Sequence, residues 1–450
     1  MSNHSKLEIN FGTDGIRGKS NQHPFDEPTL FRLGCAIAKW CITKYANKNP
    51  KILIGHDTRQ SCPVVKKKLE NGLLTFPIKI IDAKILPTPA IYQLIKNDKS
   101  FNCGIMISAS HNPYKDNGIK LFDSQTGKLS KSDEEIIIKN YNEKLKKEIP
   151  KTSQKKGSLI LNEQCYTKYK ENLLSLFPKD FLSGLKIVLD CANGATYKIA
   201  PDIFESFGAN VIKIATNPNG KNINDNCGAL FPQKLQQIIL NNHADIGFAF
   251  DGDGDRVVAI NKNGQIKDGD DLLAILSQNQ KYIGCKKIVG TIMTNKGLEK
   301  FLKDHNKELI RTKVGDKYIA AKLNEENLLI GGETSGHIIL KDYLNTGDGI
   351  LVALKILKTI INSNNWDLDS FDKYPQFLIN VSVKQKKDLS LSPFSKIISE
   401  EKNKLINGRT VIRYSGTENL LRVMVEDSKY DSAQKIATNL ASKLQKALQL

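Results

Sequence analysis

The chain has 450 residues, 40% hydrophobic and 25% charged, a composition typical of a globular protein with about three domains. No apolar run approaches the roughly 18 residues of a membrane-spanning helix, and we expect no secretory signal in the polar N-terminus. The net charge of +18 permits a nucleic-acid-binding surface, but the basic residues are dispersed and no basic tract alternates with aromatic residues, which argues against one.

The first functional feature along the chain is a glycine-rich segment at residues 11–18 that carries Arg17. Three glycines within eight residues predict a close approach of the backbone to a ligand. Arg17 suits a phosphate, and we count it among the catalytic residues. The segment does not match the Gly-x-Gly-x-x-Gly spacing of dinucleotide sites, and the chain contains no Gly-x-x-x-x-Gly-Lys-Ser/Thr loop.

After a predicted helix at residues 29–45, one pattern of strand, helix-sized spacer and strand occurs three times. This alternation is typical of parallel βαβαβ units. The strand-like runs are 51–54, 78–81 and 104–107, then 185–189, 211–214 and 246–250, then 287–289, 309–311 and 328–330.

The pattern changes near residue 375 to a compact α+β unit, with predicted strands at 377–383, 410–413 and 420–426 and a helix from 431 onward. We therefore predict an α/β fold of three similar βαβαβ-type domains with mixed sheets, followed by a smaller α+β C-terminal domain around a central cleft. The polar segment 146–158 is interpreted as a linker. The predicted domains are 1–153, 154–256, 257–372 and 373–450.

An unusual polar loop follows the third strand of each set, at residues 108–112, 251–256 and 332–337. Ligands of open α/β sheets bind beyond the carboxyl ends of the strands. We therefore expect the three loops to meet in one cleft.

The first of these loops carries Ser110 and His111, and Lys120 follows within ten residues of Ser110. Taken alone, a Ser-His-Asn-Pro segment is an ordinary turn. Beside a phosphate-handling site, Ser110 could carry a phosphoryl group covalently. His111 and Lys120 could stabilise charge or move protons, and either could equally be a structural hydrogen-bonding residue.

The second loop alternates Asp251, Asp253 and Asp255 with glycines. Three carboxylates suit Mg²⁺, although a purely structural acidic turn is the alternative. An EF-hand is excluded because Arg256 and Lys262 stand where that loop needs glycine and glutamate. Arg256 can bind a phosphate, and a serine phosphate would complete the Mg²⁺ shell, so the loops together suggest phosphoryl transfer.

Two further loops supply candidate substrate-binding residues. The hydrogen-bonding side chains of the third loop suit sugar hydroxyls, although this signal is weak alone; they are Glu333, Ser335 and His337. The loop between the last two strands resembles an anion nest more than a simple hairpin turn. Its candidate phosphate-binding residues are Arg413, Ser415, Gly416, Thr417 and Arg422.

These motifs resemble the α-D-phosphohexomutase superfamily almost end to end, in its order and spacing, at residues 11–18, 107–122, 251–256, 332–337 and 413–426. Subtler likenesses point to its glucosamine branch, at residues 107–110, 222–228, 311–316, 346–349 and 422–426. Two positions depart from the pattern. Asn419 stands where the superfamily usually has proline, and Thr334 where the branch commonly has glutamine.

The resemblance implies interconversion of glucosamine 6-phosphate and glucosamine 1-phosphate, a step towards UDP-N-acetylglucosamine and cell-wall precursors. It implies a phosphorylated Ser110 that exchanges its phosphate through a 1,6-bisphosphate, with glucosamine 1,6-bisphosphate or a similar bisphosphate as activator. One Mg²⁺ per active site would be bound by the three aspartates and the phosphoserine. Glu333, Ser335 and Gly315 would bind the sugar, and residues 413–417 its distal phosphate.

Several alternatives stay open. Within the same chemistry the chain could be a phosphoglucomutase or phosphomannomutase, and outside it a Mg²⁺-dependent phosphatase or a nucleic-acid-binding protein. We expect a phosphosugar as partner, no nucleic acid, no membrane, and a monomer or homodimer. The eight cysteines are scattered without a Cys-x-x-Cys pair, which predicts reduced thiols in a cytoplasmic protein.

Overall fold

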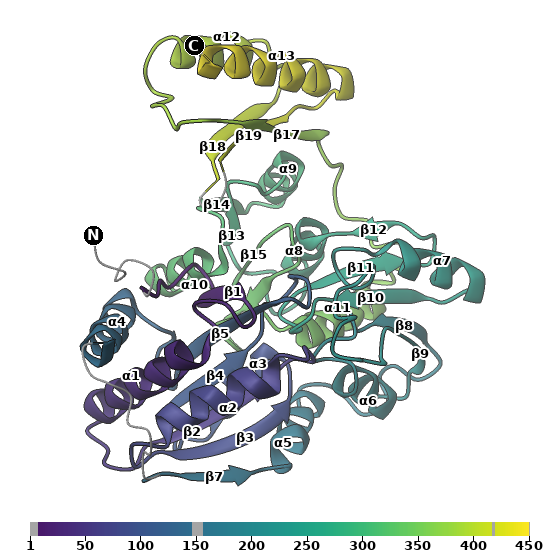
Figure 1. Ribbon diagram of the computed structural model, residues 1–450. Helices are drawn as coiled ribbons and strands as arrows, with labels where there is room; N and C mark the ends of the chain where they lie inside the picture. The colour runs from purple at the N-terminus through teal and green to yellow at the C-terminus, as the bar shows by residue number, and fades with distance from the viewer. Residues whose placement is uncertain (1–7, 146–155, 416–418, 450) are drawn as a thin grey trace. The chain divides into compact units, whose positions relative to one another are not determined.

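The computed structural model describes residues 8–145, 156–415 and 419–449. They fall into two compact units, Met1–Ile283 with Gly315–Asp369, and Gly284–Val314 with Ser370–Leu450. The elements of both units are labelled in Figure 1. Within the described part of the chain, no helix is both long and apolar enough to cross a membrane.

The first unit begins with a 7-stranded mixed sheet in the order β1-β5-β4-β2-β3-β7, with β6 paired to β5. Its central strand β4 is apolar and buried along its whole length, as expected for a strand inside a covered sheet. The strands are β1 (Ile16–Lys19), β2 (Lys51–His56), β3 (Lys79–Ile85), β4 (Cys103–Ile107), β5 (Asp116–Asp123), β6 (Gly127–Lys128) and β7 (Ser158–Leu161). The helices are α1 (Glu27–Tyr45), α2 (Cys62–Leu73), α3 (Thr88–Asn97) and α4 (Lys131–Leu145).

A second, 5-stranded sheet of this unit has the order β12-β11-β10-β8-β9, in which β8, β9 and β10 are parallel. Its strands are β8 (Lys186–Asp190), β9 (Asn210–Ile214), β10 (Ile246–Phe250), β11 (Val257–Asn261) and β12 (Ile266–Lys267). Its helices are α5 (Gln164–Leu174), α6 (Ile199–Ser206) and α7 (Gln233–Asn242). The unit is completed by α8 (Gly269–Ser277), α10 (Asp316–Glu325), β15 (Ile330–Gly332), β16 (Ile338–Leu340) and α11 (Gly349–Ser363).

The second unit contains the parallel pair β13 (Lys287–Thr291) and β14 (Glu308–Thr312) with α9 (Lys296–Asp304). It also contains a 3-stranded antiparallel sheet in the order β17-β19-β18. Its parts are β17 (Gln376–Ser382), β18 (Arg409–Tyr414), β19 (Leu420–Glu426), α12 (Phe394–Lys402) and α13 (Tyr430–Gln449). The two helices lie on one face of this sheet (Figure 1), where Ile436, Leu440 and Leu444 are buried in one core with Val423.

The polar loops of the first unit are hairpin loops. Antiparallel pairs β4–β5, β10–β11 and β15–β16 flank them, so each loop connects a strand to a return strand beside it. A hairpin fixes both ends of its loop to a rigid sheet, which positions the loop side chains. The α/β class with mixed sheets and a smaller α+β C-terminal part is confirmed.

Two sheets extend past the predicted domain boundaries. β7 begins after residue 153 yet pairs with β3, and β11 lies after residue 256 yet pairs with β10. In the second sheet the polar loop at 251–256 does not end the domain, because the chain returns from it as β11 and pairs with β10. Most of the predicted linker, residues 146–155, lies outside the described residues.

Candidate active site

Ser110 lies at the start of the hairpin loop between β4 and β5, and it is 1% exposed. Its backbone is in the left-handed region at φ 52°. Its Oγ donates a hydrogen bond to Asp251 Oδ2 at 2.6 Å, and His111 Nδ1 lies 3.2 Å from the same oxygen. The serine loop and the aspartate loop therefore meet, although 141 residues separate these partners in the sequence.

The carboxylates of Asp251, Asp253 and Asp255 are buried, and their oxygens lie within 4.8 Å of one another. Asp253 Oδ1 is buried and has no hydrogen-bond donor among the described residues. A buried carboxylate oxygen without a donor is costly unless a cation satisfies it. Because Mg²⁺ prefers hard oxygen ligands, this set of residues fits a divalent ion of that kind.

The pKa values of Asp251 and Asp255 are shifted in opposite directions. Burial, and then the charges of Asp255 and Asp253, raise the pKa of Asp251 well above its ordinary value. Burial also acts to raise the pKa of Asp255, but the charge of Lys120, together with the contact to His337, outweighs it and lowers that pKa well below its usual range. The charged form is therefore favoured for Asp255, which faces Lys120, and disfavoured for Asp251, which faces the other carboxylates.

Lys120, in β5, is the central cation of this site. Its Nζ lies 2.8 Å from Asp253 Oδ2, 2.9 Å from Asp255 Oδ2 and 2.8 Å from Asp14 Oδ2. Burial opposes its charge, yet these three carboxylates raise the pKa of Lys120 well above its ordinary value. The ammonium is thus fixed and charged beside the aspartates, where it can stabilise negative charge on a phosphoryl group.

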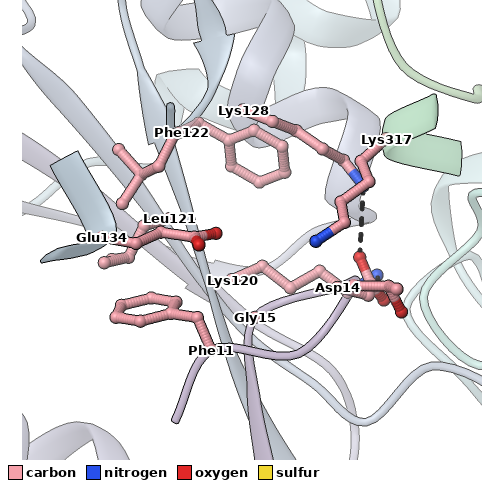
Figure 2. Close-up of a pocket in the computed structure, with 11 residues that line it drawn as sticks. Phe11, Asp14, Gly15, Lys120, Leu121, Phe122, Lys128, Glu134 and Lys317 are labelled. Atoms are coloured by element: carbon pink, nitrogen blue, oxygen red, sulfur yellow. Dashed lines mark hydrogen bonds and ion pairs between the residues drawn. The ribbon is translucent and has the colours of Figure 1, made fainter. Parts of the chain in front are cut away.

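Asp14, which sequence reasoning overlooked inside the glycine-rich segment, connects three cations. Besides Lys120 it accepts from Arg17 Nη2 at 2.5 Å and pairs with Lys128 Nζ at 3.3 Å. Burial raises the pKa of Asp14, but Lys120, Lys128 and Arg17 together lower it. Figure 2 shows the Lys128–Asp14 ion pair in the lining of a pocket whose apolar residues include Phe11 and Phe122.

Lys128 also forms an ion pair with Asp316, the first residue of α10. The residue before it, Gly315, donates its backbone N–H to Glu333 Oε1 at 2.8 Å. Two predicted sugar-binding residues, Gly315 and Glu333, are thereby brought together, and a third, Ser335, is exposed beside them in sequence.

His337, the remaining residue of the predicted sugar loop, is 2% exposed and both ring nitrogens face protein groups. Its Nε2 accepts the backbone N–H of Gly347 at 3.1 Å, so the ring proton is on Nδ1, 3.6 Å from Asp255 Oδ1. From this position His337 can orient the Asp255 carboxylate, in the way that residues behind a metal site orient the metal ligands. It gives no support to the predicted contact with a sugar.

Two arginines, Arg17 and Arg256, act on the serine loop. Arg17 Nη1 donates to the carbonyl of Ala109 at 3.0 Å, and Arg256 Nε has no hydrogen-bond acceptor among the described residues. Burial, and then the charges of Arg256 and Arg17, lower the pKa of His111 to about 3. His111 is therefore neutral at physiological pH, which removes it as an imidazolium acid and leaves it as a hydrogen-bonding partner of Ser110.

In the second unit, Arg413 on β18 is directly opposite Arg422 on β19. Burial, and then the charge of Arg422, lower the pKa of Arg413, because like charges facing one another on neighbouring strands repel. Ser415 is buried, and its carbonyl accepts from Lys386 Nζ at 2.9 Å, a cation that the motif did not include. The predicted residues Gly416 and Thr417 lie outside the described residues.

Behind the aspartate loop, Asp348 accepts the Leu351 N–H at the start of α11 at 3.0 Å and the Tyr169 hydroxyl at 3.0 Å. The next residue, Gly349, donates to the carbonyl of Gly254 at 3.0 Å, which ties this helix start to the aspartate loop. Burial raises the pKa of Asp348 to about 6.

Comparison with known protein families gives four matches that follow one another along the chain. They are the phosphoglucomutase/phosphomannomutase alpha/beta/alpha domain I at residues 8–148, domain II at 165–264, domain III at 268–372, and the C-terminal domain at 378–443.

Individual proteins match over nearly their whole length. A phosphoglucosamine mutase of Caldicellulosiruptor bescii is 44% identical over 97% of this chain and 99% of its own. Among solved structures, a phosphoglucomutase/phosphomannomutase family protein of Burkholderia thailandensis has a TM-score of 0.79 at 20% identity, covering 99% and 98% of the two chains. The N-acetylphosphoglucosamine mutase of Aspergillus fumigatus, in complex with GlcNAc-6P and magnesium, has a TM-score of 0.67 at 17% identity, covering 98% and 96%.

The raised pKa of Asp348 predicts a pH-dependent stability. Because the folded-state pKa of about 6 lies above the ordinary 3.8, the stabilisation is complete below pH 3.8 and is lost as pH rises through 6. Asp348→Asn keeps the cap and removes the titration. We expect its stability relative to the original protein to rise by about 1–1.5 kcal/mol between pH 5 and pH 8 in urea unfolding. The exposed control Asp180→Asn should show no such trend, and parallel pH profiles for both variants would contradict this assignment.

Proposed function

The chain belongs to the phosphoglucomutase/phosphomannomutase family, and from this premise we propose that it interconverts glucosamine 6-phosphate and glucosamine 1-phosphate through a phosphorylated Ser110. The observation that carries the proposal is the 2.6 Å contact between Ser110 Oγ and the buried Asp251 carboxylate. A hydroxyl placed directly at a cluster of metal-type ligands is positioned to hold a phosphate and a cation together.

In the first half-reaction a sugar hydroxyl attacks the phosphorus of phosphoserine, the P–Oγ bond breaks, and Ser110 Oγ takes the bonding electrons and a proton. The product is a sugar 1,6-bisphosphate. In the second half-reaction Ser110 Oγ loses its proton and attacks the other phosphorus, and the bond from that phosphorus to the sugar breaks. The sugar oxygen takes the bonding electrons and a proton, and the isomeric monophosphate leaves. Splitting one transfer into two keeps the phosphoryl group inside the protein throughout.

The residues around Ser110 stabilise charge during these transfers. Asp251, Asp253, Asp255 and the serine phosphate would hold Mg²⁺, which when bound neutralises charge on the transferred phosphoryl group. Lys120 presents a fixed ammonium beside the same aspartates, and Arg17 and Arg256 are the neighbouring guanidinium groups. His111 acts as a neutral hydrogen-bonding partner of the serine oxygen, at 3.2 Å.

Substrate recognition is assigned to two groups of residues. Glu333, Gly315 and Ser335 would bind the sugar hydroxyls. The distal, non-reacting phosphate would bind the cationic loop of the C-terminal sheet, with remote binding energy used for positioning. That loop comprises Arg413, Ser415, Gly416, Thr417 and Arg422.

The cellular setting follows from this chemistry. A 1,6-bisphosphate of glucosamine or of a similar sugar would act as the activator that first phosphorylates Ser110. The product would feed UDP-N-acetylglucosamine synthesis. A cytoplasmic location suits the eight cysteines, which are thiols and of which seven are buried.

Ser110→Ala should abolish mutase activity, with a loss of at least about 10³-fold in kcat, because no other group carries the phosphate. After incubation with a sugar 1,6-bisphosphate, peptide mass mapping should find one phosphate on Ser110 of the original protein and none on the variant. The surface variant Ser132→Ala serves as the matched control and should behave as the original protein. Near-normal turnover by Ser110→Ala would refute the phosphoserine mechanism.

Asp253→Asn should raise the Mg²⁺ concentration for half-maximal activity by at least about 10-fold, since it removes one anionic ligand. The measurement is a Mg²⁺ titration of mutase rate at saturating substrate, with circular dichroism to verify folding. Asp225→Asn, at an exposed site, is the control. An unchanged titration for Asp253→Asn would remove this residue from the ligand set.

Phosphoglucomutase or phosphomannomutase activity is the second candidate, because the matching family model carries both names. We expect kcat/KM for glucosamine phosphate to exceed that for glucose or mannose phosphate by at least about 10-fold, the discrimination that one polar substituent supports. Parallel coupled assays on the three 6-phosphates measure this ratio. A higher kcat/KM for glucose or mannose phosphate would identify the chain as a phosphoglucomutase or phosphomannomutase. Release of free phosphate faster than formation of the isomeric sugar phosphate would identify a phosphatase.

A further inference from the structure

We propose that Arg59 is a positioning residue that holds the serine loop in the conformation in which Ser110 contacts Asp251, a role that rests on the function proposed above. Arg59 lies three residues after β2, outside the serine, aspartate, sugar and phosphate loops. It does not contact the reacting oxygen itself. It acts through the backbone of the loop that carries that oxygen.

The guanidinium of Arg59 is completely buried, and every nitrogen of it donates. Nε donates to Asp57 Oδ2 at 2.8 Å. Nη2 donates to the carbonyls of Ser110 and Asn112, both at 2.8 Å. Nη1 donates to the carbonyl of Asp116 at 3.1 Å and to that of Pro113. Five N–H groups thus meet five acceptors, four of which are backbone carbonyls within residues 110–116.

The loop requires such a partner for two reasons. Ser110 has a left-handed backbone, which non-glycine residues adopt only where their surroundings enforce it. In addition, its carbonyl and that of Asn112 point inward, where unsatisfied acceptors are costly. Asn224 Nδ2 donates to the same two carbonyls, at 2.9 and 3.2 Å.

Asp57 completes the same support from the other side of Ser110. Its Oδ2, which accepts from Arg59 Nε, also accepts from Ser108 Oγ at 2.6 Å. Ser108 Oγ in turn accepts the backbone N–H of Ser110 at 2.9 Å. Both backbone groups of Ser110 are therefore held by one buried network that begins at Arg59, and the direction of the Ser110 side chain follows from it.

Lysine cannot replace arginine here. A planar guanidinium presents five donors in fixed directions, whereas an ammonium has three donors on a single nitrogen. Lysine at position 59 could not reach Asp57 and both pairs of loop carbonyls at once. The serine loop would lose contacts on one side while the sugar and phosphate residues stay unchanged.

The test measures catalysis and stability separately. For Arg59→Lys and Arg59→Met we expect kcat, and the rate at which a sugar 1,6-bisphosphate phosphorylates Ser110, to fall about 10²-fold, the typical result of a misplacement near 1 Å. KM for the sugar phosphate should change by less than about 3-fold, because the residues assigned to sugar and distal-phosphate binding are untouched. Asn224→Ser removes the second donor to the carbonyls of Ser110 and Asn112 and should also lower both kcat and the phosphorylation rate. This variant tests the proposal even if the Arg59 variants do not fold.

Lys66→Met is the matched control, since it breaks a mostly buried ion pair with Asp82 in the same sheet region without touching the serine loop. It should lower Tm but leave kcat unchanged. The proposal is overturned if the Arg59 and Asn224 variants keep the original phosphorylation rate, or if their loss of kcat does not exceed that of Lys66→Met. Failure of the original protein itself to phosphorylate Ser110 or to isomerise the sugar would refute the proposed function instead.

Discussion

Mutual repulsion of buried carboxylates is the constraint on which the site depends. Asp251, Asp253 and Asp255 occupy one hairpin loop out of contact with bulk water, and the protein can keep them there only with positive charge alongside. Lys120 supplies part of that charge from a different sheet. Its ammonium thereby joins the aspartate loop to β5, the strand that follows the serine loop. The ion pairs that offset the carboxylate repulsion therefore also fix the two loops relative to each other.

Ion pairs extend from the aspartate loop around the site. From Asp255 they pass through Lys120 and Asp14 to Lys128 and Asp316. This series of ion pairs connects the metal-type loop with the start of α10, where Gly315 donates to Glu333. Residues proposed to bind the sugar and residues proposed to bind the cation are consequently held by one set of interactions, so displacement of either loop has to disturb the other.

Local patterns explain which parts of this arrangement were predictable. Strand and helix periodicity located most of the parallel strands, and alternating Asp and Gly residues identified the metal-type loop. Both were predictable because each signal is contained within a short stretch of sequence. The return strand β5 was not predicted, because most of it lies within the serine motif at residues 107–122. The partners of Lys120 could not be predicted, since the ion pair with Asp253 joins residues more than 100 positions apart and leaves no local trace. The role of Arg59 could not be predicted either. Its four carbonyl partners lie more than 50 positions away in the sequence, and backbone carbonyls carry no signature of residue type.

The paired arginines of the C-terminal sheet have a consequence for how this part of the molecule behaves. Arg413 and Arg422 face each other across β18 and β19, and the charge of Arg422 lowers the pKa of Arg413. The phosphate proposed to bind here would offset the repulsion between the two guanidinium groups. We therefore expect the pairing of β18 with β19 to be more stable while a phosphosugar is bound than while the site is empty.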